Sequence, residues 1–436
     1  MINRLLQAAG AAALLLSTPA SAALSRAEQK MTTTVDAEQQ RTIGMLERWV
    51  DQNSGTMNKA GVVAVRDMVA PEFKQLGFTT EWIDMAAADR AGHLVARHAG
   101  RKTGKRLLLI AHLDTVFEPD SPFQRWERQG EQAKGPGSGD DKGGIAVIVA
   151  ALRAMQAAGT LKNANVTVFM TGDEEDAGSP IALARRDLIA EGKKADVALD
   201  FEDLSVEDGK DMGVIARRSA GSWTLTVTGK SAHSSGVFAP GVGYGAIYEL
   251  ARILDQFRRE LPEDKLTYNV GLVGGGQTAR LDEGKIRIEA TGKTNIVAAT
   301  AVARGDLRAI SQEQIDRVQG KMRAIVAQSL PQTSAEISFD PDYYPPMAPT
   351  EGNRALLAEL NGVNRDMGLA AMSELDPSKR GAGDISFVAA DVDGLVGLGP
   401  ASSGSHTASE AVDIPSIFKQ AKRAAILMSR LSAQRR

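Results

Sequence analysis

Short, continuous apolar segments in the first half of the chain alternate with segments of helical periodicity. Arg106–Ala111 is a continuous apolar run with no polar alternation, which is typical of a strand that is buried on both faces. Asn165–Met170 and Ala195–Leu199 are predicted as a second and a third buried strand. Helices are predicted before and between them, over Asp36–Asp51, Ala60–Leu76 and Gly143–Met155. Strands separated by helices favour an α/β fold with a mainly parallel sheet.

Beyond residue 212 the pattern changes to an alternation of apolar and polar positions. Ser222–Thr228 is the clearest example, and a strand of this kind has one face in water. Helices and half-exposed strands then follow over Tyr244–Leu261, Leu266–Val273, Ile286–Ala290, Thr300–Ala309, Gln312–Leu330 and Ala335–Phe339. The β-α-β-β-α-β order predicts a small α+β domain. Signals of buried helices and strands, like those of the first half, return after Asn353 and end in a helix over Ile414–Leu431.

The predicted organisation is an α/β domain that is interrupted by a smaller α+β domain. We place the larger domain at residues 23–212 and 342–436 and the inserted domain at residues 213–341. A chain of 436 residues is long enough for two domains.

The N-terminus has a pattern of its own. Arg4 precedes an apolar run over residues 5–16, and Ala20-Ser21-Ala22 follows. A basic start, a short apolar run and small residues predict a secretory signal over residues 1–22 that is cleaved after Ala22. A membrane anchor is the alternative, but the run is shorter than the ~20 residues that span a bilayer. We therefore expect an exported protein, either periplasmic or secreted, that leaves the membrane after cleavage.

The amino-acid composition limits which partners, cofactors and catalytic groups the protein can use. The net charge of −3 arises from interspersed acidic and basic residues, so nucleic acid and anionic membranes are not expected as partners. The absence of cysteine excludes disulfides, thiolate ligands and cysteine nucleophiles. Any metal would be held by imidazole and carboxylate groups, which favours zinc, cobalt or manganese.

Metal-capable side chains follow the predicted strands or lie in Gly/Ser loops. They are His112, Asp140, Glu174, Glu175, Glu202 and His406. The carboxyl ends of parallel strands are where open α/β sheets place their sites. Asp114 is also well placed to accept the second ring N–H of a metal-bound His112. Together these clusters predict a dinuclear metal hydrolase with a bridging carboxylate.

Each cluster taken alone has a simpler explanation. His112 could be a capping or core histidine, and acidic or histidine clusters in loops are often merely solvated. A phosphate-binding loop is a rival for Gly135–Gly144. However, the Gly-Lys-Ser/Thr sequence is absent there, and Asp140 and Asp141 would repel phosphate.

The same segments resemble the zinc metallopeptidase family that includes aminoacylase, acetylornithine deacetylase, succinyl-diaminopimelate desuccinylase and glutamate carboxypeptidase. The matching stretches are Ala111-His112-Leu-Asp114-Thr-Val116, Gly135-Pro-Gly-Ser-Gly-Asp140-Asp-Lys-Gly-Gly144, Thr171-Gly-Asp-Glu174-Glu175, Phe201-Glu202 and Ser405-His406-Thr407. The resemblance covers nearly all of the mature chain and is greatest to bacterial glutamate carboxypeptidases. It implies a phosphorylase/hydrolase-like di-zinc domain with an inserted dimerisation, or lid, domain.

The resemblance also implies a role for each matched residue. The implied ligands are Asp140 as the bridge between two zinc ions, His112 and Glu202 at one ion, and Glu175 and His406 at the other. Glu174 would be the general base for the attacking water, and Asp114 would orient His112.

In the inserted domain, Gly229-Lys-Ser-Ala-His233 resembles the segment whose histidine enters the active site of a partner and polarises the scissile carbonyl. The alternative for His233 is an exposed turn histidine. Asn295 and Arg308 resemble residues that bind substrate, and Arg308 is suited to a bidentate pair with a carboxylate. These likenesses imply a homodimer.

Two departures from the family pattern concern the substrate. Glutamate carboxypeptidases carry a further arginine on the strand that leaves the inserted domain, whereas Phe339–Pro346 contains no basic residue. The glycine-rich substrate loop is retained in a shortened form at Gly381-Ala-Gly383-Asp384. A preference for glutamate is therefore not carried over from the family.

The predicted function is hydrolysis of an amide or peptide bond next to a C-terminal amino acid. Deacylation of N-acyl amino acids is the alternative within the same chemistry. A catalytically silent peptide-binding protein is a third hypothesis. The presence of Glu174 beside Glu175 disfavours it, because binding alone needs no base.

Overall fold

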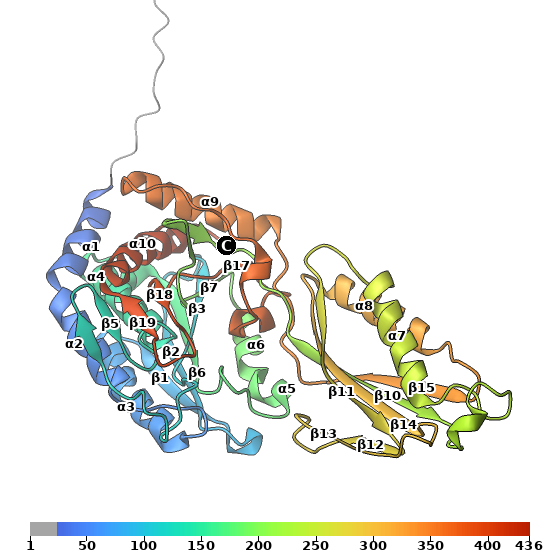
Figure 1. Cartoon of the computed structure of the whole chain (residues 1–436). Helices are drawn as coiled ribbons and strands as arrows, with labels where there is room; N and C mark the ends of the chain where they lie inside the picture. Colours follow the sequence, from blue (N-terminus) through green and yellow to red (C-terminus); the bar gives the residue numbers. More distant parts are fainter. Residues whose placement is uncertain (1–23) are drawn as a thin grey trace, which may run out of the picture.

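The computed structural model describes residues 24–436, which form two lobes (Figure 1). The larger lobe contains the first and last parts of the chain, and the smaller lobe contains the middle part. The predicted signal and its cleavage site after Ala22 lie outside the described residues. Within residues 24–436, the helices are too short or too polar to cross a membrane.

A six-stranded sheet forms the centre of the larger lobe. Its order is β1-β2-β6-β3-β7-β17. The strands are Thr79–Asp84, Gly92–His98, Asn165–Thr171, Arg106–His112, Val197–Asp200 and Gly394–Leu395, in that order. The pairs β6–β3, β3–β7 and β7–β17 are parallel, whereas β2 pairs antiparallel both with β6 and with the edge strand β1. The predicted α/β fold with a mainly parallel sheet is confirmed.

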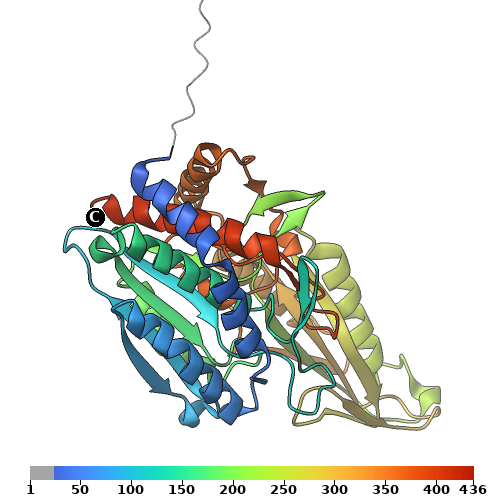
Figure 2. The same cartoon turned by 90° about the vertical axis from the view of Figure 1, so that its left-hand side faces the viewer.

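The central strand β3 is apolar from Leu107 to Ala111 because both of its faces are buried. Leu107 and Leu109 pack into the core on one face, while Leu108 and Ile110 pack into the core on the other. The helices of the first core are α1 (Arg26–Ala37), α2 (Gln39–Val50), α3 (Lys59–Gln75), α4 (Lys142–Ala157), α9 (Glu351–Asp366) and α10 (Ile414–Ala433). Figure 2 shows α1, α3, α4 and α10 in front of this face of the sheet.

The opposite face of the sheet is covered by shorter elements. These include α5 (Ile181–Ala184) and α6 (Arg186–Gly192), and Leu188 of α6 joins Phe169, Ile385 and Val388 in the core there. The remaining short strands form two further sheets. One is β16-β9-β8, with strands Ser373–Glu374, Lys210–Gly213 and Val206–Glu207, and the other is β18-β19-β5-β4, with strands Ser402–Ser403, Ala411–Asp413, Gln132–Lys134 and Glu127–Gln129.

The smaller lobe is built on an antiparallel sheet in the order β11-β14-β10-β15. These strands are Thr267–Gly276, Thr300–Arg308, Gly221–Gly229 and Thr333–Phe339, and the helices are α7 (Ala246–Glu260) and α8 (Gln312–Val326). Both helices lie on one face of the sheet (Figure 1). Trp223, Leu225 and Val227 of β10 point into the core beneath them, as the alternating pattern predicts.

Some elements differ from the sequence-based expectations. The segment predicted as a strand at Ile286–Ala290 does not join the main sheet of the smaller lobe. It belongs to a hairpin of β12 (Thr278–Leu281) and β13 (Ile288–Thr291). The helix α1, the edge strand β1 and its neighbour β2 are absent from the predicted elements. The domain boundaries at residues 212/213 and 341/342 stay a prediction.

Two isoleucines of α7 give a matched test of the smaller core. Ile253 is fully buried, whereas Ile247 on the same helix is 49% exposed. Ile253→Ala should lower the free energy of unfolding by about 2–5 kcal/mol, because it removes buried apolar surface and leaves a cavity. Ile247→Ala should lower it by less than half as much. Urea unfolding followed by circular dichroism measures both, and equal losses would contradict the assigned core.

Candidate metal centre

The loops that carry the predicted site residues meet at one edge of the large sheet. β3 ends at His112, which is paired in parallel with Thr171 at the end of β6. Glu174 and Glu175 follow β6 directly, and Glu202 follows β7. Because the three strands are parallel, the loops after them emerge on the same side of the sheet.

A second pairing brings the C-terminal part of the chain to the same place. β19 pairs with β5, and these strands lie next to the loop of His406 and the Gly-rich loop of Asp140, respectively. The structure therefore places the loop of Asp140, just before α4, beside a loop from the far end of the sequence.

The carboxylate of Asp140 lies between two histidines. Its Oδ1 is 2.9 Å from Nε2 of His112, and its Oδ2 is 3.2 Å from Nε2 of His406. The same nitrogen of His406 is 3.1 Å from Oε2 of Glu175. One ligand atom each from His112, Asp140 and Glu175 lie within 4.8 Å of one another. Imidazole nitrogen and carboxylate oxygen are donors that zinc accepts, so this set fits a metal ion.

Asp114 connects the donor loops. Its buried carboxylate accepts the backbone N–H groups of Glu174 and Glu175 at 3.1 Å each and the hydroxyl of Thr56 at 2.7 Å. Nδ1 of His112 lies 3.1 Å from the Asp114 carbonyl oxygen and 3.4 Å from its Oδ1. The second nitrogen of His112 thus has a partner, which is the arrangement that orients imidazole ligands.

The close contacts shift the pKa values of the paired groups in opposite directions. Burial raises the pKa of Asp140, but the hydrogen bonds with His112 and His406 outweigh burial and hold that pKa below its ordinary value. The hydrogen bonds with Asp140 and Glu175 raise the pKa of His406 to about 11.

Glu202 lies beside the group but is not part of it. Its Oε2 is 2.6 Å from Nη1 of Arg217 and 3.2 Å from Nη2 of Arg380. It nevertheless lines the same cavity of about 320 Å³ as Asp140 and His406. Sequence reasoning missed both arginines. The one available signal was the pair of consecutive arginines, Arg217 and Arg218, just before the first strand of the inserted domain.

Glu174 lines this cavity as well. Burial, and then the charge of Glu202, raise its pKa well above the ordinary value. A half-buried carboxyl group beside a set of metal donors is placed as a proton-transfer group needs to be.

A further acid lies behind Asp140. Glu410 is buried, and its Oε1 accepts the backbone N–H groups of Gly139 and Asp140 at 3.3 and 3.5 Å. Burial, and then the charge of Asp140, raise the pKa of Glu410 to about 8. Sequence reasoning missed this residue, because a single glutamate in a loop gives no signal of its own.

The candidates from the inserted domain are not brought to the metal centre. Within the described part of one chain, His233, Asn295 and Arg308 are not among the residues that line the cavity of Glu202. Nδ1 of His233 is 2.8 Å from the Ser235 hydroxyl, Asn295 is exposed, and Nε of Arg308 donates to Asp306 at 3.1 Å.

Gly383, in contrast, lies against the centre. A Cβ atom at this position would be 2.1 Å from Nη1 of Arg217 and 2.6 Å from Oε1 of Glu202. The following residue, Asp384, accepts from Nε of the buried Arg185 at 2.7 Å, which fixes the loop. Sequence reasoning missed Arg185, because its partner Asp384 lies 199 positions away in the sequence.

Comparisons with known sequences identify the family. Residues 108–430 match the model of Peptidase family M20/M25/M40. Carboxypeptidase G2 from Pseudomonas sp. is 31% identical over 287 residues, which are 64% of this chain and 62% of that protein. A succinyl-diaminopimelate desuccinylase from Leptothrix cholodnii is 29% identical over 201 residues, which are 44% of this chain and 51% of that protein. The matched regions thus span less than two thirds of either relative.

Solved structures show the same fold. A tripeptidase from Staphylococcus aureus superimposes with a TM-score of 0.70 at 19% identity, covering 91% of this chain and 99% of that one. An M20 family metallo-carboxypeptidase from Sulfolobus solfataricus gives 0.61 at 16%, with 90% and 99% covered. A dinuclear metal-binding peptidase of the M20 family from Bacillus subtilis gives 0.63 at 14%, with 91% and 99% covered. At these identities the likeness concerns the fold alone.

The contacts of Asp114 generate a prediction about metal affinity. Asp114→Asn should weaken zinc binding by about 10- to 100-fold, because an amide orients His112 and the Glu174–Glu175 backbone less well than a carboxylate. Asp120→Asn is the matched control, since Asp120 is exposed. Calorimetric titration of the apoprotein with zinc measures both variants, and wild-type affinity in Asp114→Asn would contradict this role.

Proposed function

Because the chain belongs to peptidase family M20/M25/M40, we propose that it is a di-zinc hydrolase of carboxypeptidase type, which cleaves the amide bond next to a C-terminal amino acid. The observation that carries the proposal is the Asp140 carboxylate, with one oxygen at His112 and the other at His406. A carboxylate whose two oxygens face two separate donor groups is suited to bridge two cations.

We assign His112 and Glu202 to one ion and Glu175 and His406 to the other, with Asp140 shared. Co²⁺ or Mn²⁺ would suit the same nitrogen and oxygen donors. Glu202 would have to exchange its arginine partners for the cation, and its place in the shared cavity supports this assignment. When bound, the two ions would lower the pKa of a water molecule towards neutrality and polarise the scissile carbonyl.

Glu174 is the proposed base. It takes the proton of the attacking water and then donates that proton to the nitrogen of the leaving amine. Its position in the cavity beside Asp140 and Glu202 supports this role. The loop contacts made by Asp114 keep the backbone of Glu174 in place during both transfers.

The substrate residues of the inserted lobe require a second chain. We propose a homodimer in which His233 of one chain polarises the carbonyl in the active site of the other. Arg308 and Asn295 would bind the substrate carboxylate, and the backbone at Gly383 would line the substrate near Glu202. The guanidinium of Arg308 is partly exposed and paired through Nε with Asp306, which leaves its terminal nitrogens suited to a carboxylate. Periplasmic or secreted location is proposed on residues 1–22 alone.

Deacylation of N-acyl amino acids is the second candidate. One similar protein is named a succinyl-diaminopimelate desuccinylase, and this name refers to the removal of an acyl group. Zinc-loaded protein is assayed on dipeptides, N-acyl amino acids and folate-like conjugates at equal concentration. We expect release of the C-terminal amino acid from peptides or conjugates. Faster hydrolysis of N-acyl amino acids would favour the second candidate. Calorimetric binding of peptides without hydrolysis would favour a silent binding protein.

The proposed base gives a prediction about one variant. Glu174→Gln should keep its zinc but lose about three decades of kcat, because an amide cannot accept the proton. Glu127→Gln, at an exposed position of β4, is the matched control and should keep wild-type kcat. Zinc content by elemental analysis and kcat on the best substrate are measured together. Normal turnover by Glu174→Gln would remove the proposed base.

A further inference from the structure

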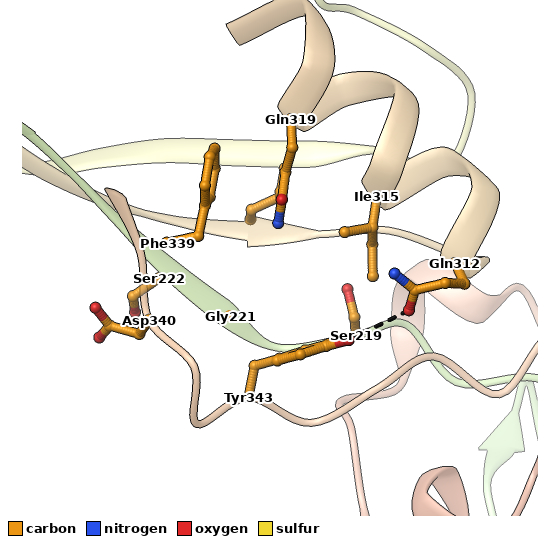
Figure 3. A pocket seen from close by; sticks show the side chains of 10 residues that line it. Ser219, Gly221, Ser222, Gln312, Ile315, Gln319, Phe339, Asp340 and Tyr343 are labelled. Atoms are coloured by element: carbon orange, nitrogen blue, oxygen red, sulfur yellow. Dashed lines mark hydrogen bonds between the residues drawn. The ribbon is translucent and has the colours of Figure 1, made fainter. Parts of the chain in front are cut away.

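The segment that leaves the inserted lobe contacts both lobes through neighbouring tyrosines. Tyr343 lines a cavity of about 200 Å³ beside α8 (Figure 3), and its hydroxyl donates to Oε1 of Gln312 at 3.3 Å. The hydroxyl of Tyr344 instead donates to the backbone carbonyl of Glu174 at 2.8 Å. Successive side chains of an extended segment point to opposite sides, so this pair of tyrosines spans the joint between the lobes.

Other contacts hold this segment in place. Tyr344 and Ala220 exchange two backbone hydrogen bonds of 3.0 Å, which fasten it to the strand that enters the inserted lobe. Asp342 accepts from the Ser179 hydroxyl at 2.9 Å and from the N–H of Ile181 at 3.1 Å. The segment is thus attached both to the path into the inserted lobe and to the loop that follows Glu174.

The buried Arg185 sets the direction of the Tyr344 hydroxyl. Its Nη1 and Nε donate to Asp173 and Asp384 at 2.7 Å each, and its Nη2 donates to the Tyr344 oxygen at 3.2 Å. Arginine carries donors only, so the Tyr344 oxygen accepts from Arg185 and its own proton is available for the Glu174 carbonyl. Burial, and then the charge of Glu174, raise the pKa of Tyr344 well above its ordinary value, which keeps this proton on the hydroxyl.

The backbone that carries Glu174 is held on two sides. The carboxylate of Asp114 accepts the N–H groups of Glu174 and Glu175, and the hydroxyl of Tyr344 binds the Glu174 carbonyl. Asp114 belongs to the larger lobe, whereas Tyr344 belongs to the segment that is fastened to the inserted lobe.

We propose that Tyr344 is a positioning residue for Glu174, and that it ties the placement of this group to the placement of the inserted lobe. The inference rests on the proposed function, in which Glu174 transfers the proton. A proton-transfer group must be held to a fraction of an ångström to act. The hydroxyl of Tyr344 supplies one of the contacts that hold it, without touching the substrate.

Tyr344→Phe tests this role, since it removes the hydroxyl and keeps the ring that packs 4.9 Å from the ring of Phe387. We expect kcat to fall about three- to tenfold, the size of one lost hydrogen bond, with unchanged KM and zinc content. Amide hydrogen exchange in residues 173–178 should become faster. Tyr343→Phe is the matched control, because it removes the neighbouring hydroxyl that faces α8. It should leave kcat and this exchange at wild-type values.

Glu174→Gln in the same assay separates the two proposals. If Glu174→Gln turns over normally, the proposed function fails. If Glu174→Gln is inactive while Tyr344→Phe matches the wild type in kcat and exchange, the role of Tyr344 alone is overturned. Loss of zinc by Tyr344→Phe, or an equal effect of Tyr343→Phe, would overturn it too, because the hydroxyl would then serve the ligands or the general stability of the joint.

Discussion

The contact of one carboxylate with two histidines is the constraint on which the metal centre depends. Asp140 contacts His112 at the end of β3. It also contacts His406, which lies 266 positions after Asp140 in the chain. The contact with His406 forms only if the first and last parts of the chain share one sheet and one core. The pairing of β19 with β5 meets this condition, and the inserted lobe with its separate core leaves it undisturbed.

The concentration of acids at this sheet edge has an electrostatic cost that the surrounding cations offset. Buried carboxylates without partners are strongly disfavoured. Burial, and then the charge of Glu202, raise the pKa of nearby Asp200 to about 8. The two arginines beside Glu202, Arg217 and Arg380, supply positive charge. The same excess of carboxylate groups makes the site suitable for binding divalent cations.

The elements that position the site were predictable because each is encoded locally. β3 contains the apolar run Leu107–Ala111 and β6 the shorter run Val168–Met170. The motifs that follow these strands place His112 and Glu174 at a sheet edge. The edge strand β1 has only partly buried or exposed residues, so it gives no apolar run to detect. The helix α1 has few buried apolar side chains and gave no signal either.

The contacts around the site were not predictable, because they join residues that are distant in sequence. Arg217 meets Glu202 and the loop of Gly381, and Tyr344 meets Glu174 across 170 positions. The absence of an arginine in Phe339–Pro346 was visible in the sequence, but what Tyr344 does there was not. The roles of His233, Asn295 and Arg308 stay predictions, since a single chain does not bring them to the centre.

Zinc content after reconstitution and dialysis tests the central claim most directly, with the wild type and Asp140→Ala measured side by side. The account predicts about two zinc ions per wild-type chain and loss of zinc in Asp140→Ala, with both proteins folded by circular dichroism. A wild type that retains no zinc, or an Asp140→Ala variant that keeps the wild-type content, would contradict it.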